Sequence, residues 1–131
     1  MRVRSLMVGL VVAASVVASA SSARAPEYQT DPALAFLRTV NTLQADGSAS
    51  RYRGLIELVA DPALAPSFEP FRSQLTVTGD DVDLAASRVT LVVSRDRRHY
   101  QIAIVPTTGC RTSWFSSDSG TIYRGMPLGC P

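Results

Sequence analysis

The stretch SRVTLVVSRDRRHYQIAIVP, residues 87–106, decides the fold class of this chain. Two runs rich in valine and isoleucine, 87–94 and 99–106, are separated only by the charged residues 95–98. Runs of β-branched residues joined by so short a polar segment are typical of two antiparallel strands in a β-hairpin. We therefore expect a hairpin with a charged tip.

The alternating pattern continues on both sides of this hairpin. Downstream, residues 112–115 and 121–123 flank the turn sequence SSDSG, which predicts a second hairpin. Upstream, FRSQLTVTG at 71–79 alternates between polar and apolar residues and predicts a strand that ends at Gly79. An acidic turn, residues 80–83, is expected to follow it. The sequence thus predicts an antiparallel sheet of three or four strands.

Residues 31–45, DPALAFLRTVNTLQA, have the spacing of an amphipathic helix. Asp31 is expected to cap the first turn, and Pro32 suits the first helical position because it has no amide hydrogen to leave unbonded. Gly47 is expected to end the helix in a left-handed conformation. The apolar residues recur every three or four positions and predict a core stripe made of Leu34, Leu37, Val40 and Leu43, with Phe36 beside it.

A second, shorter helix is predicted within SRYRGLIELVA, residues 50–60. Its expected apolar face carries Tyr52, Leu55, Ile56 and Val59, and Gly54 weakens the helical propensity. The pentapeptide DPALA of residues 31–35 recurs at 61–65, but Pro66 and Pro70 exclude a long helix after the second copy. We interpret the recurrence as a reused helix cap and not as a duplicated unit.

Helices that precede a run of antiparallel strands define an α+β fold. The predicted architecture is an N-terminal helix, plus a shorter second helix, packed on a three- to four-stranded antiparallel sheet with a C-terminal disulfide loop.

The first 25 residues have the features of a secretory signal peptide. Arg2 and Arg4 precede an apolar run, and small residues end in Ala-x-Ala at Ala25. We expect cleavage after Ala25, so that residues 26–131 form a single periplasmic or secreted domain with no stable membrane anchor. Retention of residues 1–25 as an uncleaved anchor is the alternative.

Export bears on the two cysteines, because thiols pair in oxidising compartments. Cys110 and Cys130 are therefore expected to form one disulfide bond. Zinc binding by these cysteines and His99 is the weaker alternative, since their spacing matches no common zinc pattern. His99 is the single histidine and the chain has no lysine, so the sequence shows no nucleophile with its base. We expect a non-enzymatic protein without a cofactor, with His99 solvated at a strand end.

The charge of the mature chain argues against nucleic-acid binding. Removing Arg2, Arg4 and Arg24 leaves 10 of 13 basic residues against 11 acidic ones, a net charge of about −1. Nucleic-acid binding requires a basic patch that replaces the counterions of the phosphates. We therefore expect no nucleic-acid partner.

Two surface clusters are candidate sites. The candidate interaction surface consists of Arg95, Arg97, Arg98, Trp114 and Tyr123. Its arginines could bind an anionic partner or a glycan, but a solvent-facing hairpin tip is the favoured interpretation. Trp114 and its neighbour Phe115 could line a binding site, but the favoured interpretation is that one ring enters the core and the other is half-covered. The second cluster offers carboxylates for calcium, with a solvated turn as the favoured interpretation: Asp80, Asp81 and Asp83.

The segments LRTVNTLQ (37–44) and CRTSWFSSDSGTIYRG (110–125) resemble the exposed half of the helix and the last hairpin of type IV pilins and pseudopilins. The resemblance covers most of residues 31–130 and implies a pilin-like globular domain. The prepilin motif is lacking: Leu10 follows Gly9, and Ala14 stands where pilins carry glutamate. The resemblance therefore implies a soluble, exported pilin-like domain and not an ordinary fibre subunit.

Two functions remain as expectations. The first is an exported structural or interaction module of the cell envelope with a protein partner. The second is a small secreted ligand-binding domain, or an enzyme accessory, with the cone shape of cystatin-like proteins. A cone is expected to hold a deep pocket lined by Trp114, Tyr123 or Tyr100, whereas the core stripe is expected to fill a pilin-like sheet.

Overall fold

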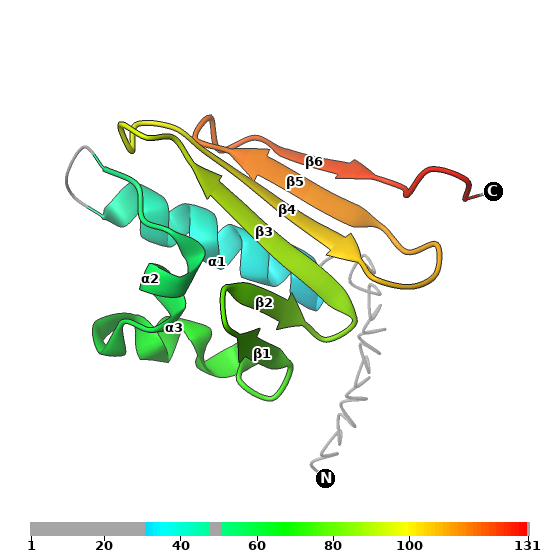
Figure 1. Cartoon of the computed structure of the whole chain (residues 1–131), viewed down its shortest axis with the longest axis horizontal. Coiled ribbons are helices and arrows are strands. Elements are labelled where there is room, and N and C mark those ends of the chain that lie inside the picture. Colours follow the sequence, from blue (N-terminus) through cyan, green and yellow to red (C-terminus); the bar gives the residue numbers. More distant parts are fainter. Residues whose placement is uncertain (1–30, 48–50, 131) are drawn as a thin grey trace, which may run out of the picture.

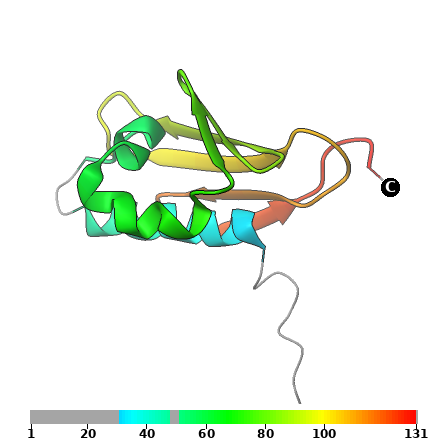
Figure 2. The ribbon, with the colours of Figure 1, turned by 90° about the horizontal axis from the view of Figure 1, so that it is seen from below.

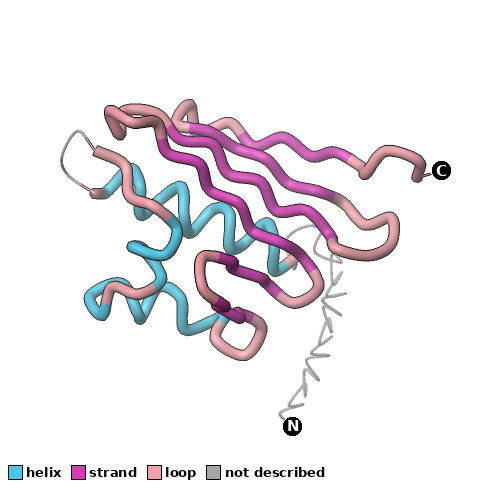
Figure 3. Tube along the Cα trace, in the orientation of Figure 1, coloured by secondary structure: helices cyan, strands magenta, loops and turns pink. Residues whose placement is uncertain are grey.

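The computed structural model describes residues 31–47 and 51–130. The predicted signal peptide, residues 1–25, lies outside the described residues, so its cleavage stays a prediction. The chain folds into helices followed by strands, as an α+β fold requires (Figures 1 and 3). The helices are α1 (Pro32–Asp46), α2 (Leu55–Val59) and α3 (Ala65–Phe68), with the 3-10 helices η2 (Pro62–Leu64) and η3 (Glu69–Phe71). The strands are β1 (Leu75–Thr78), β2 (Asp81–Leu84), β3 (Ser87–Val93), β4 (Tyr100–Pro106), β5 (Ser113–Ser117) and β6 (Ile122–Gly125).

The sheet is an antiparallel meander of six strands in the order β1-β2-β3-β4-β5-β6, which is larger than the three or four strands predicted. The prediction was wrong at the acidic turn, because residues 81–84 form strand β2. Val82 and Leu84 are buried there, while Asp81 and Asp83, which alternate with them, take the outward positions of the strand. Only Gly79 and Asp80 make the turn, and the φ of +62° at Gly79 is one that glycine adopts without strain.

Both predicted hairpins are confirmed. Strands β3 and β4 pair over their whole length, from Ser87 opposite Pro106 to Val93 opposite Tyr100. Strands β5 and β6 pair around the predicted turn, where Gly120 has a φ of +74°. The predicted strand at 71–79 begins only at Leu75, because Phe71 ends η3 and residues 72–74 form a turn.

Helix α1 is confirmed, and the side chain of Asp31 caps it as expected by accepting from the backbone N–H of Ala33 at 2.8 Å. The apolar stripe faces the core, with one exception at its end. Leu43 is only half-buried, and Gln44 is buried in its place. Gly47 is not left-handed, since its φ is −61°, and it ends the helix by donating to the carbonyl of Leu43. The buried residues of the helix are Leu34, Phe36, Leu37, Val40 and Gln44.

The second helix is shorter than predicted because Gly54 is its N-cap and not an interior residue. Leu58 is deeply buried, whereas Val59 is half-buried, which shifts the inward face by one residue. Tyr52 lies before the helix, and its ring packs edge-on against that of Tyr100 at a centroid distance of 4.7 Å.

The two copies of DPALA share a cap but not a fold. The Asp61 side chain accepts from the N–H of Ala63 at 2.9 Å, as Asp31 does in the first copy. The second copy then forms the 3-10 helix η2, and the short helices α3 and η3 follow, with Pro66 and Pro70 in their first turns.

The helices and the sheet enclose a single apolar core. Figure 2 shows α1 running lengthwise along strands β4 and β5, while the β1–β2 hairpin bends away from them. The ring of Phe36 packs against those of Phe68 and Phe71, at centroid distances of 5.7 and 5.1 Å, which holds α3 and η3 to α1. Within residues 31–47 and 51–130, no helix has the length and apolar character needed to cross a membrane.

Hydrogen bonds between buried or half-buried side chains join α1 to the sheet. The hydroxyl of Tyr100 donates to Oδ1 of Asn41 at 2.9 Å, and Nδ2 of Asn41 donates to the hydroxyl of Ser116 at 2.8 Å. Burial raises the pKa of Tyr100 to about 12. In the described part of the chain, every buried side-chain nitrogen or oxygen has a hydrogen-bond partner, so the core carries no unpaired polar atom that would weaken it.

A shared carboxylate ties the start of α1 to the last hairpin. Nε1 of Trp114 donates to Oδ2 of Asp31 at 2.8 Å, while Oδ1 of the same carboxylate caps the helix. We expect Asp31→Asn to cost about 1 kcal/mol, because the amide keeps the capping oxygen but turns an N–H toward the indole N–H. Asp31→Ala is expected to cost about 2 kcal/mol, because the cap is lost as well.

Urea unfolding of both Asp31 variants, followed by the fluorescence of Trp114, measures these differences. Equal stability of Asp31→Asn and the wild type would contradict a role for the indole hydrogen bond.

Candidate interaction surface

The face of the sheet that α1 does not cover carries exposed apolar side chains. The strand register places Thr90, Ala103, Phe115 and Tyr123 side by side across β3 to β6. Directly paired residues point to the same side of a sheet, so these four share one face. Ile104 and Trp114, which alternate with them along the strands, are buried on the face toward α1.

We call the uncovered side the open face, defined by Val92, Phe115 and Tyr123. These side chains are 62, 38 and 60% exposed. A shallow groove of about 350 Å³ runs between them, and its polar lining includes Gln101 and Ser117. An aromatic and aliphatic patch on rigid strands, with polar residues at its margin, is the composition of a protein-binding surface.

The structure separates the two aromatic residues of the predicted interaction surface. Tyr123 lies on the open face, whereas Trp114 is 7% exposed and faces α1, where it bonds Asp31. Tyr100 is also buried toward α1. Of the aromatic residues named as candidates for the wall of a cone-shaped pocket, Tyr123 therefore lies on the opposite face of the sheet from Trp114 and Tyr100.

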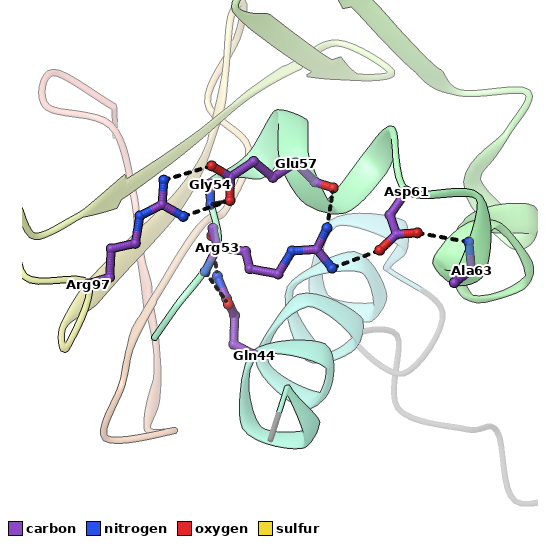
Figure 4. Close-up of polar contacts among 7 residues, drawn as sticks. All are labelled: Gln44, Arg53, Gly54, Glu57, Asp61, Ala63 and Arg97. Atoms are coloured by element: carbon purple, nitrogen blue, oxygen red, sulfur yellow. Dashed lines mark hydrogen bonds and ion pairs between the residues drawn. The ribbon is translucent and has the colours of Figure 1, made fainter. Parts of the chain in front are cut away.

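The arginines of the β3–β4 tip are separated as well. Arg97 adopts a φ of +57° and forms a two-armed ion pair with Glu57, at 2.9 Å from Nη1 to Oε2 and 2.8 Å from Nη2 to Oε1 (Figure 4). The carbonyl of Arg97 also accepts from the N–H of Tyr52 at 2.7 Å. Arg97 therefore fastens α2 to the hairpin tip, and only Arg95 and Arg98 of the predicted cluster face solvent without an ion pair in the described part of the chain.

A second arginine extends this network into the helical layer. Arg53 donates to Oδ2 of Asp61 at 2.8 Å and to the carbonyl of Glu57 at 2.9 Å (Figure 4). The buried amide of Gln44 brackets the backbone of Arg53, donating to its carbonyl at 2.6 Å and accepting from its N–H at 3.0 Å. These contacts hold the segment before α2 against the end of α1.

The ion pair of Glu57 makes stability depend on pH. Hydrogen bonding from the guanidinium of Arg97 is the main cause that lowers the pKa of Glu57. The stabilisation is complete above the ordinary glutamate pKa of about 4.3 and is lost as the pH falls through the lower pKa of the folded state.

We expect the Tm of Glu57→Gln to fall less than that of the wild type between about pH 5 and about pH 2.5, since the variant has already lost this contribution. Glu69→Gln is the control, because the ion pair that Glu69 forms in the described part of the chain lies within its own turn, with Arg72. Parallel Tm curves for wild type and Glu57→Gln over that range would contradict the prediction.

The aspartates considered for calcium are engaged by an arginine. Arg88 pairs with Asp81 at 2.9 Å and also with Asp83, its direct cross-strand neighbour. These carboxylates raise the pKa of Arg88, mainly through the hydrogen bond that Arg88 donates to Asp83. In the part of the chain that the structure describes, no group of three acidic, histidine or cysteine residues lies close enough to hold a metal ion. Asp80 stands apart in the β1–β2 turn.

His99 has a partner that the sequence did not suggest. Its Nδ1 lies 2.8 Å from Oδ2 of Asp118, and the N–H of Asp118 donates to the carbonyl of Tyr100 at 3.2 Å. The pair joins the two hairpins at one end of the sheet and is largely exposed. Among the described residues the imidazole is hydrogen-bonded to this carboxylate and to no hydroxyl or thiol.

The predicted disulfide is confirmed. The sulfurs of Cys110 and Cys130 are 2.16 Å apart and their Cα atoms 5.5 Å apart, which closes the segment that contains the second hairpin. Both sulfurs are consumed by this bond, so neither cysteine is available as a zinc ligand or a nucleophile.

Comparisons with protein-family profiles, with curated proteins and with solved structures give no significant match to this chain.

Proposed function

We propose that this protein is an exported, non-enzymatic structural or interaction module of the cell envelope, pilin-like in its organisation, that binds a protein partner through the open face. The observation that carries the proposal is the exposed apolar groove formed by Val92, Phe115 and Tyr123 on a rigid sheet. Isolated apolar side chains on a surface need no explanation, but a connected aromatic patch is a candidate contact site.

The disulfide bond and the strands beneath the groove give further support to the proposal. A disulfide is consistent with an oxidising periplasmic or extracellular location, in agreement with the expected signal peptide. The groove lies on three strands of the sheet, β3, β4 and β5, and on the edge strand β6. Because these strands are hydrogen-bonded to one another, the surface loses little conformational entropy when a partner binds.

The experiment is site-specific photo-cross-linking in cells that export the full chain. Tyr123 is replaced by the photoreactive residue p-benzoylphenylalanine, and the same residue replaces Arg38, which is exposed on α1, as the control. We expect one defined cross-linked adduct from position 123 and none from position 38. The absence of an adduct at position 123, or identical adducts from both positions, would contradict the proposal.

Ligand binding is the second candidate function, and one observation favours it. A larger cleft lies beside Trp114, on the other side of the sheet from the open face. The apolar residues and the two arginines that line this cleft indicate one class of ligand.

A further inference from the structure

The cleft of about 560 Å³ lies at one end of the sheet, where the start of α1, the β2–β3 turn and the β4–β5 loop meet. Figure 1 shows that the start of α1, the β4–β5 loop and the C-terminal tail gather at this end. The volume lies within the range of small-molecule sites. Apolar side chains make up much of the lining: Pro32, Ala33, Leu84, Ala85, Pro106, Trp114 and Met126.

The cleft is held in shape by bonds within its wall. Trp114 is fixed by its bond to Asp31, and the disulfide partner Cys110 forms part of the wall. Each oxygen of the Asp31 carboxylate already accepts one hydrogen bond, from Ala33 and from Trp114. The cleft is therefore built before any ligand arrives, which reduces the entropic cost of binding.

Two arginines give the cleft a positive charge. Arg124 is the direct cross-strand neighbour of Trp114, so its side chain starts on the same face of the sheet as the indole. Arg111 is anchored by one bond from Nη2 to the carbonyl of Ala86, at 3.3 Å. A guanidinium has five N–H donors, so this bond leaves most of them free for a ligand.

Neither Arg111 nor Arg124 forms an ion pair within residues 31–47 and 51–130. Four other arginines do form ion pairs with carboxylates there: Arg53, Arg72, Arg88 and Arg97. The charged groups that line the cleft are these two arginines and Asp31. Their sum is one positive charge, which a ligand with a single negative charge would neutralise.

We infer that this cleft binds a small monocarboxylate with an apolar body, such as a medium-chain fatty acid. The planar guanidinium groups match a carboxylate, with which arginine forms paired hydrogen bonds. The apolar body would lie beside Trp114, against the exposed side chains of Pro32, Ala85 and Met126, and remove their surface from water. This inference does not depend on the partner surface proposed above, because Trp114 and Tyr123 lie on opposite faces of the sheet.

Trp114 is the single tryptophan of the chain, so its fluorescence reports on this cleft. The probe is octanoate, titrated into the disulfide-bonded mature protein, with octanamide as the uncharged analogue of the same length. We expect a saturable change in emission with a Kd of about 1 mM or tighter for octanoate, and binding of octanamide at least about tenfold weaker.

Matched variants test the role of the arginines. Arg111→Gln and Arg124→Gln are each expected to weaken octanoate binding at least about tenfold, whereas Arg38→Gln, on the exposed side of α1, is expected to leave it unchanged. Met126→Glu adds a carboxylate at an exposed position of the cleft wall and is expected to weaken binding by repulsion. Circular dichroism confirms that each variant is folded before titration.

Three results would overturn the inference: no saturable change with octanoate, equal binding of octanoate and octanamide, or unchanged binding by both arginine variants. Cross-linking at Tyr123 would be unaffected by any of them, so the two proposals fail separately.

Discussion

Replacement of Leu37 by aspartate is expected to abolish folding of the domain. Leu37 is 0% exposed and lies in the middle of the stripe by which α1 packs on the sheet. A carboxylate at this position has no partner in the surrounding core of aliphatic and aromatic side chains, and the free energy of burying an unpaired charge exceeds the stability of a small domain. We expect a loss of about 4 kcal/mol or more, measured as the absence of a cooperative thermal transition by circular dichroism.

Arg38→Asp is the matched control, since Arg38 is the next residue of α1 and is exposed. It introduces the same carboxylate into the same helix and is expected to change the free energy of unfolding by no more than about 1 kcal/mol. A Leu37→Asp protein that melts like the wild type would show that the stripe does not face the core.

Removal of the disulfide is expected to have the second-largest effect. The Cys110→Ser, Cys130→Ser double variant frees a loop whose ends are 20 residues apart in sequence. In the chain-entropy account, loss of such a cross-link costs about 3 kcal/mol, which lowers the Tm of a domain of this size by roughly 12–24 °C. Differential scanning calorimetry of the mature protein measures the shift.

A reducing agent separates the effect of the bond from that of the serines. Reduction is expected to lower the Tm of the wild type toward that of the double variant and to leave the double variant unchanged. The non-reduced, denatured wild type is also expected to react with no thiol reagent. Labelling of two thiols would contradict the disulfide.

The elements that the sequence predicts well are those whose signals are local. Helix α1 carries its own cap and stripe, and the β3–β4 hairpin carries β-branched runs around a short turn. Strand β2 was missed because its alternating pattern contains only two apolar residues, Val82 and Leu84. The aspartates beside them are typical of turns. The burial of β2 depends on pairing with β3, which lies later in the chain.

The candidate interaction surface was predicted less well, because its residues contact others that lie far away in the sequence. Arg97 pairs with Glu57 across 40 residues, and Trp114 bonds Asp31 across 83. The sequence shows a cluster of arginines and two aromatic residues. It does not show that Arg97 forms an ion pair within the domain or that Trp114 is buried in the core. Strand alternation assigns Trp114 and Tyr123 to different faces only when the register of β5 and β6 is known, and that register is set by the turn at residues 118–120.

Gln44 illustrates a second kind of missed residue. An amide at the end of an apolar stripe suggests the solvated end of a helix, yet it is buried because both of its polar groups bond the backbone of Arg53. Such burial is favourable only when both groups are satisfied, and that condition is visible only in three dimensions.

The central claim is that one face of the sheet is closed by the helices and the other is free to meet a partner. Val89 and Val92 of strand β3 test it directly, since they have the same side chain but are 4% and 62% exposed. The measurement is the broadening of their methyl signals in NMR spectra by a soluble gadolinium chelate. We predict strong broadening for Val92 and little for Val89; equal broadening of the two, or stronger broadening of Val89, would contradict the account.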